Sequence, residues 1–326
     1  MKKPTQRWFA LTLTLSVTLT MGLAGCSSTS ETAASGSQSA AANMPEVDRS
    51  GTGNFPDVTG DFGQNPQIAA GNGDAPTDKI WVKTLHQGNG PEVGADDTIR
   101  VNYTGTLWDG KVFDSSFMRN IPISFSLNGV IAGWKYGLAS QHVGDRVELV
   151  IPAQWAYGDQ AQNSIPAGST LVFVVDILDT VNGSDLSALK GASLTGETIE
   201  GIEVSGELGQ EPKITFTGAP APAEAKIITL AKGAGHEIVA GDSVIIHGMG
   251  GTYGDENSIN GTWQPPHPVT VDAAAYGLVG YTVGSRLLMT QPISAQQGQS
   301  GDDSQSASPS TQILVVDVVA SLSAAS

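Results

Sequence analysis

Cysteine is almost absent from this chain of 326 residues, in which Cys26 is the single example. One thiol cannot form an intramolecular disulfide or a redox couple, so packing must stabilise the fold. The histidines show no ligand spacing, and neither a metal nor another cofactor is expected. These histidines are His86, His142, His236, His247 and His267.

Basic residues are also scarce, because 16 lysines and arginines stand against 32 aspartates and glutamates, which gives a formal net charge of −16. A chain this acidic is repelled by nucleic acid and by anionic lipid head groups. No basic patch is evident, so nucleic acid is excluded as a partner. The apolar run at residues 8–23 is too short to favour a membrane-spanning helix.

Residues 1–25 have the organisation of a secretory leader, with three basic residues followed by that apolar run. The leader ends in LAGC, which resembles the bacterial lipobox, where the cysteine becomes the lipid-modified first residue of the mature protein. We therefore expect an exported lipoprotein, attached through Cys26 to the outer face of the bacterial cell membrane. A leader that merely contains a cysteine is the alternative.

The rest of the chain divides into a tether and two similar units. Residues 26–54 are rich in Ser, Ala, Thr and Gly, which predicts a flexible tether. The sequence VTGDFGQNPQI, which begins at Val58, then recurs as VSGELGQEPKI from Val204, and three further anchors recur in the same order. We expect domains at 55–181 and 200–326, joined by a polar linker at 182–199.

The first unit shows strand and helix periodicities. Apolar residues alternate with polar ones along 99–103 and 147–151, which is typical of strands with one buried face. Residues 171–178 are almost continuously apolar, as in a central strand. Ile131, Trp134 and Leu138 fall on one face of a helix predicted at 130–140. These elements predict an α+β fold, in which an antiparallel sheet wraps around a short helix.

The stretch 103–134 combines aromatic and aliphatic side chains with one acid, Asp114. It contains no nucleophile-base pair, so it is poorly equipped to cut bonds. An apolar site of this composition is suited to binding a proline-like ring and changing its conformation.

Several spaced motifs now become recognisable: YTGxLxDGxxFDSS from Tyr103, VIxGW ending at Trp134, AYG around Tyr157, and LVFxVxxL from Leu171. Over roughly residues 80–179 the chain resembles the FKBP-type peptidyl-prolyl isomerase family. The resemblance implies a curved antiparallel sheet over a short helix. It also implies non-covalent cis/trans isomerisation of X-Pro bonds in exported polypeptides, and macrolides of the FK506 or rapamycin type as further ligands.

The resemblance also implies a role for each matching residue. It makes Asp114, Tyr157, Trp134 and Phe113 catalytic, with Trp134 as the floor beneath the proline ring and Arg119 as the support of the acid. The residues implied to bind substrate are Tyr103, Ile123, Phe125, Val130, Ile131, Ile165 and Phe173. Ile123 replaces a phenylalanine of the family, Trp155 replaces a common tyrosine, and the loop 159–164 is unusually polar, which bears on substrate preference and macrolide affinity.

The second unit keeps the anchors but not the site. Gly248 aligns with Tyr103, no FDSS survives, and the segment that would contain VIAGW is shortened, so the short helix is expected to be reduced or lost. Residues 294–310 are expected to be disordered. The glycines at 248–251 follow an apolar strand, as in a phosphate-binding turn, but the prolines after them favour a reshaped hairpin. We expect a degenerate unit without isomerase activity.

Two other functions stay open from sequence alone. The first unit could capture proline-containing segments without turnover, as a binding module or chaperone at the cell surface. The chain could also be a purely structural surface lipoprotein, although that function does not account for the complete set of site residues in the first unit.

Overall fold

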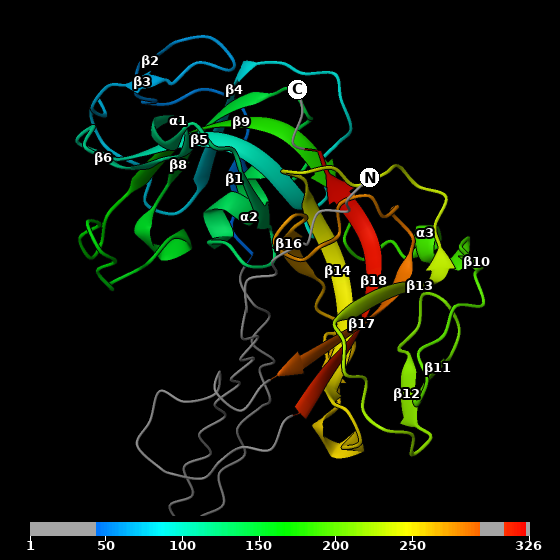
Figure 1. Cartoon of the computed structure of the whole chain (residues 1–326). Helices are drawn as coiled ribbons and strands as arrows, with labels where there is room; N and C mark the ends of the chain where they lie inside the picture. The colour runs from blue at the N-terminus through cyan, green and yellow to red at the C-terminus, as the bar shows by residue number, and fades with distance from the viewer. Residues whose placement is uncertain (1–43, 294–309, 324–326) are drawn as a thin grey trace, which may run out of the picture. The chain divides into compact units, whose positions relative to one another are not determined.

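The computed structural model describes residues 44–293 and 310–323, which belong to one compact unit (Figure 1). The predicted leader, Cys26, most of the tether and nearly all of the loop at 294–310 lie outside the described residues. Within these ranges no helix has both the length and the apolar character needed to cross a membrane.

The first half contains a seven-stranded sheet in the order β1-β4-β8-β9-β5-β6, with β7 paired to β5. Its neighbours are antiparallel except for β1 and β4, which run parallel. The strands are β1 (Val47–Asp48), β4 (Ile80–His86), β5 (Thr98–Leu107), β6 (Val112–Ser115), β7 (Ile123–Ser126), β8 (Arg146–Ile151) and β9 (Leu171–Val181).

Helix α2 (Ala132–Leu138) packs against β4 and β8. It begins and ends two residues inside the predicted range of 130–140. Trp134 and Leu138 are 4% and 0% exposed, in a core that includes Leu149 of β8. Close approach depends on Gly133, because a Cβ there would lie 2.3 Å from Ile151 Cγ2. The expected α+β arrangement, a curved sheet with a short helix against it, is thus present in the first half.

Residues 44–54 correct the prediction of a tether that extends to Asn54. Val47 pairs with Ile80 in the sheet and packs against the core. The Arg49 guanidinium donates hydrogen bonds to the Tyr136 and Ala139 carbonyls, at 2.8 and 2.7 Å, near the C-terminal end of α2. A two-residue strand has no periodicity of its own, so composition alone suggested a spacer.

The first repeat motif forms a hairpin of β2 (Val58–Thr59) and β3 (Gln67–Ile68) that closes over a buried ion pair. Arg146 and Asp176, 1% and 0% exposed, are joined by two hydrogen bonds of 2.5 and 2.8 Å. The guanidinium also donates to the Gly60 and Gln64 carbonyls, at 2.6 and 2.7 Å. The motif therefore supplies acceptors to a buried arginine.

The second half repeats this strand order as β10-β13-β17-β18-β14-β15, with β16 paired to β14. The strands are β10 (Ser193–Leu194), β13 (Lys226–Lys232), β14 (Ser243–Thr252), β15 (Asn260–Gly261), β16 (Val269–Asp272), β17 (Arg286–Ile293) and β18 (Ser310–Leu322). The repeat motif here forms the hairpin of β11 (Ile202–Ser205) and β12 (Lys213–Phe216). Its Gln210 carbonyl accepts a hydrogen bond from Arg286, which pairs with buried Asp317.

Two features of the second half depart from the first. Between β16 and β17, where the first half has α2, residues 273–277 form turns. The glycines at 248–251 lie inside β14 rather than in a phosphate-binding turn.

The predicted linker at 182–199 is also structured. It contains α3 (Ser187–Lys190) and strand β10, and Leu189 is fully buried. The polar composition of this segment did not indicate these elements, because one buried leucine and a two-residue strand find their partners only in the tertiary structure.

Glu148 on β8 is a buried acid without a hydrogen-bond partner. It is 0% exposed, and neither carboxylate oxygen is bonded among the described residues. Burial raises the pKa of Glu148 to about 8, with a smaller raising effect from Asp57 and a lowering effect from Lys83, its cross-strand neighbour. The folded protein therefore holds a proton here at neutral pH that the unfolded chain releases.

We expect Glu148→Gln to remove a pH-dependent loss of stability. Below about pH 4.5 both states of the wild type bind the proton, so the two proteins should respond alike to pH. As the pH rises to 8, only the unfolded state loses it, and the wild type should lose on the order of 3–5 kcal/mol relative to the variant. Urea unfolding at several pH values measures this. Exposed Glu92→Gln is the control, and parallel pH profiles for wild type and Glu148→Gln would contradict the expectation.

Candidate active site

Five aromatic side chains from five different elements meet in the first half. The Trp134 ring lies 5.3 Å from Tyr103, 5.6 Å from Phe125 and 5.2 Å from Phe173, in each case at 81–89°. Phe113 extends the cluster, with its ring centroid 5.5 Å from that of Phe173. Edge-to-face pairs of this kind are favourable, and together they form an apolar surface around the indole.

Strand pairing explains why these rings converge. Strand β5 pairs with β6, β7 and β9, so its residues stand beside those of all three strands. Gly105 of β5 lies opposite both Asp114 and Phe173. A Cβ at Gly105 would lie 2.7 Å from the Phe113 ring and 2.8 Å from the Phe173 ring. Glycine therefore leaves room for the two phenylalanines to meet.

One carboxylate lies beside the rings, and three donors hold it in place. Asp114 accepts hydrogen bonds from the Tyr103 hydroxyl and the Arg119 guanidinium, and from the Ser115 N–H at 2.8 Å. Arg119 also approaches the Tyr103 hydroxyl at 3.4 Å. The acid is thus oriented at the edge of the apolar cluster.

Electrostatics keep this acid charged. Partial burial opposes ionisation of Asp114, but the Arg119 guanidinium and the Tyr103 hydroxyl outweigh it and lower the pKa of the carboxyl group. Burial, and next the adjacent carboxylate, raise the pKa of Tyr103 to about 12. At neutral pH the site therefore contains an aspartate anion and a neutral tyrosine that donates to it.

Two N–H groups at the site lack acceptors among the described residues. The Trp134 indole Nε1 is buried and unpaired. The backbone N–H of Ile131, directly before α2, donates no hydrogen bond either. Of the two, only Ile131 belongs to a partly exposed residue, so its N–H is the one that a carbonyl of a bound molecule can reach.

The other residues expected at the site divide into two groups. Ile123, Val130, Ile131 and Ile165 pack against the same core as the rings, and Ile165 is 7% exposed. Tyr157 is 39% exposed and is not among the side chains of this cluster.

Ser116 is a supporting residue that sequence reasoning did not single out. Its fully buried hydroxyl accepts a hydrogen bond from the Tyr103 N–H at 2.9 Å and donates to Asn102 Oδ1 at 3.1 Å. The neighbouring Ser115 hydroxyl caps α1 (Ser116–Arg119) through the Met118 N–H. The two serines of FDSS therefore fix the backbone that presents Asp114 and Arg119, and that pair of serines was the signal in the sequence.

Comparison with known proteins identifies similar sequences. The FKBP-type peptidyl-prolyl cis-trans isomerase family matches residues 90–178, a range that contains all the candidate residues above. The chain is 46% identical over 100 residues to the FKBP-type peptidyl-prolyl cis-trans isomerase FkpA of Escherichia coli, covering 31% of this chain and 37% of that protein. It is 48% identical over 111 residues to FK506-binding protein 2 of Debaryomyces hansenii, covering 33% of this chain and 76% of that protein.

Solved structures are also similar over part of the chain. The crystal structure of FkpA from Escherichia coli is 44% identical, with a TM-score of 0.31, and the match covers 32% of this chain and 50% of that one. The crystal structure of AtFKBP13 is 31% identical, with a TM-score of 0.30, and the match covers 31% of this chain and 93% of that one. The chain thus spans well under two thirds of the length of the curated FkpA relatives that it matches, 37% of the protein from Escherichia coli.

Proposed function

This chain belongs to the FKBP-type peptidyl-prolyl cis-trans isomerase family, and from that premise we propose that its first half isomerises X-Pro bonds of exported polypeptides. The observation that carries the proposal is the cluster of five aromatic rings with one oriented, ionised carboxylate at its edge. The rings offer an apolar surface to a proline ring. Among the described residues of the site, no nucleophile is paired with a general base, so the proposed catalysis is non-covalent.

The chemistry of the reaction suits such a site. Rotation about an amide bond meets a barrier of about 18–20 kcal/mol because the C–N bond has double-bond character. A water-poor pocket withholds the hydrogen bonds that stabilise the planar, polarised amide, and its shape can favour the twisted form. Differential stabilisation of the twisted amide is sufficient for catalysis.

We assign the roles as follows. The proline ring lies on the Trp134 indole, between Tyr103 and Phe173. As the amide twists, its nitrogen lone pair no longer feeds the carbonyl group, and the carbonyl carbon becomes poorer in electrons. The Asp114 carboxylate stabilises that carbon.

The remaining site residues bind the chain around the proline. The Ile131 N–H and the Tyr157 hydroxyl donate to substrate carbonyls, and Phe113, Ile123, Phe125, Val130 and Ile165 line the site. Macrolides of the FK506 or rapamycin type are proposed as further ligands of the same surface. Arg119 keeps Asp114 ionised and oriented.

We propose that the second half is a degenerate copy of the same fold without isomerase activity. The strand registers support this: His247 pairs with Asp317 as Asn102 pairs with Asp176, so Gly248 takes the position of Tyr103. By the same registers Leu314 stands in the position of Phe173. Turns replace the helix that carries Trp134.

We further propose that the protein is exported and anchored by lipid on Cys26, as the leader predicts. Its domains would then be a catalytic first half and a non-catalytic second half, held at the membrane surface by a tether that ends before residue 44.

Exchange NMR of a short Leu-Pro peptide with the full chain tests the isomerase activity. Unaided X-Pro isomerisation takes tens to hundreds of seconds, and micromolar chain should shorten this to about a second or less. If the Trp134 indole signal shifts with peptide while the exchange rate stays unchanged, the first half is a binding module instead. If neither changes, both functions are wrong for this site.

A further inference from the structure

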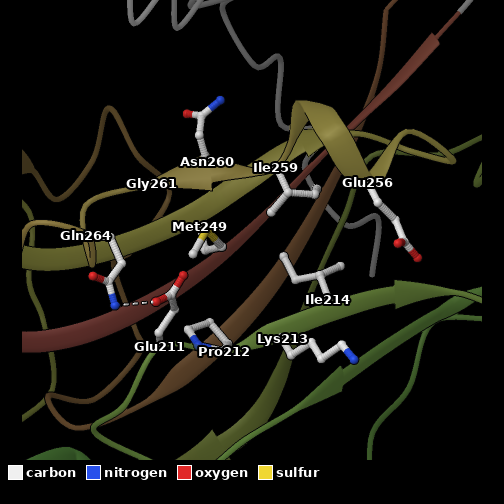
Figure 2. Close-up of a pocket in the computed structure, with 10 residues that line it drawn as sticks. All are labelled: Glu211, Pro212, Lys213, Ile214, Met249, Glu256, Ile259, Asn260, Gly261 and Gln264. Carbon is white, nitrogen blue, oxygen red and sulfur yellow. Dashed lines mark hydrogen bonds between the residues drawn. The ribbon is translucent and has the colours of Figure 1, made fainter.

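A cavity of about 570 Å³ opens in the second half, between the β11–β12 hairpin and the β14–β15 edge of the sheet. Figure 2 shows Ile214 and Met249 facing each other across it, with Gln264 and Glu211 at one end and Glu256 at the other. All the residues that line it lie between 211 and 264, so none belongs to the candidate active site. Its volume is within the range of ligand sites, about 300–1,000 Å³.

The floor of the cavity is apolar. Ile214 and Met249 are each 6% exposed and belong to one buried cluster, and the partly buried Ile259 packs against it. Pro212 is buried beside them. Such a floor exposes a small apolar surface, with the partly buried Ile259 as its most accessible aliphatic residue, and an aliphatic side chain can cover it.

One wall of the cavity is a free sheet edge. Strand β15 is the last strand of its sheet, and the Thr262 N–H donates to the Gly248 carbonyl at 2.9 Å. Because bonded pairs alternate in an antiparallel ladder, the N–H and C=O of Gly261 point away from β14. Gly261 lines the cavity, and neither group has a partner among the described residues. An edge of this kind recognises an extended polypeptide through its main chain.

The charges around the cavity indicate the sign of the charge that a bound partner should carry. Two carboxylates, Glu211 and Glu256, lie at its opposite ends against one lysine, Lys213. Glu211 is held by Gln264 Nε2 at 2.9 Å, which fixes its direction. From residue 200 to residue 326 the sequence has 4 basic and 13 acidic residues, so the field of the whole second half attracts cations.

We propose that this cavity binds a short, extended, basic segment of a partner polypeptide. An aliphatic side chain of the segment enters the floor between Ile214 and Met249, its main chain pairs with Gly261, and its lysine or arginine side chains meet Glu211 and Glu256. This gives the second half a function of its own, and it does not depend on isomerase activity in the first half.

Fluorescence polarisation of the full chain with a labelled, proline-free peptide of alternating lysine and leucine tests the proposal. Ile259→Arg places a cation in the cavity and should weaken binding by about tenfold or more. Glu256→Lys changes only an exposed rim residue and should weaken binding by about threefold and flatten its salt dependence. Thermal unfolding verifies that each variant is folded. If Ile259→Arg does not fold, Glu256→Lys still tests the proposal.

The matched controls make the same changes elsewhere in the second half: Val279→Arg at an exposed apolar residue and Glu224→Lys at an exposed acid. Both should bind like the wild type, as should Asp114→Asn, which separates this result from the fate of the proposed isomerase. Equal binding of a peptide with glutamate in place of lysine would overturn the proposal. A second result would also overturn it: no peptide binds, but an anilinonaphthalene dye binds to the wild type and its binding is weakened by Ile259→Arg. The cavity would then suit a small apolar molecule.

Discussion

Replacing Asp114 with asparagine is expected to lower kcat/KM for Leu-Pro isomerisation by about 10- to 100-fold, equivalent to about 1.4–2.7 kcal/mol of transition-state stabilisation. Asparagine keeps the size of the side chain, and its one carbonyl oxygen can still accept from the Ser115 N–H, while its NH2 group replaces the oxygen that accepts from the Tyr103 hydroxyl. It loses the negative charge next to the carbonyl carbon and one acceptor oxygen. The loss should therefore fall on catalysis rather than on folding, with an unchanged melting temperature within a few degrees.

The matched control for this change is Asp96→Asn. Asp96 is also ion-paired, with Lys135 at 2.9 Å, but its side chain is 67% exposed and lies outside the aromatic cluster. It should leave kcat/KM unaltered. If the activity of Asp114→Asn were within twofold of wild type, the carboxylate would have no role in the mechanism. Catalysis would then depend on the apolar rings. Because the second half lacks the rings, no compensating activity is expected from it.

Replacing Arg146 with methionine should give the largest loss of stability, a decrease of about 3–5 kcal/mol in the free energy of unfolding. The change leaves the Asp176 carboxyl group fully buried and without its cation. It also leaves the Gly60 and Gln64 carbonyls without their donor. Urea unfolding followed by tryptophan fluorescence measures the loss, since four of the tryptophans lie in the first half.

Two further variants separate the buried pair from ion pairs in general. Lys79→Met breaks the Lys79–Glu46 pair, whose side chains are 37% and 67% exposed, and should cost far less stability than the loss of Arg146, because water screens exposed ion pairs. Removing both buried partners, as Arg146→Met with Asp176→Leu, should recover part of the loss because no lone buried charge remains. A cost below about 1 kcal/mol for Arg146→Met alone would show that the hairpin does not depend on this arginine.

Much of the candidate site could be anticipated from the sequence, and particular residues show why. The alternation in 99–103 predicted the strand that carries Tyr103, and the helical spacing of Ile131, Trp134 and Leu138 predicted α2 to within two residues at each end. Both patterns are local, and each reflects one buried face. Tyr157 is the exception in the set, because the AYG motif named it, yet its side chain is 39% exposed and lies outside the aromatic cluster.

What the sequence could not predict depends on contacts between distant segments. Residues 44–54 and 182–199 look like spacers, yet β1 and β10 find partners in Ile80–His86 and Lys226–Lys232. The sequence likewise does not indicate that the carboxylate of Glu148 is unpaired, because residues 147–151 show the usual alternation of apolar and polar residues of a strand. Composition describes a segment alone, whereas pairing depends on the edge that it meets.

By itself the sequence determined the family and predicted the residue types of the proposed site and two related halves, because motifs and repeats are carried by residues close together in the chain. Only the tertiary structure decided why the repeat motif recurs, since its carbonyl groups meet Arg146 and Arg286 from some 80 residues away. It also decided where the second half is open, because the cavity arises from the packing of a hairpin against a sheet edge. Non-local packing fixes such features, and no local pattern encodes them.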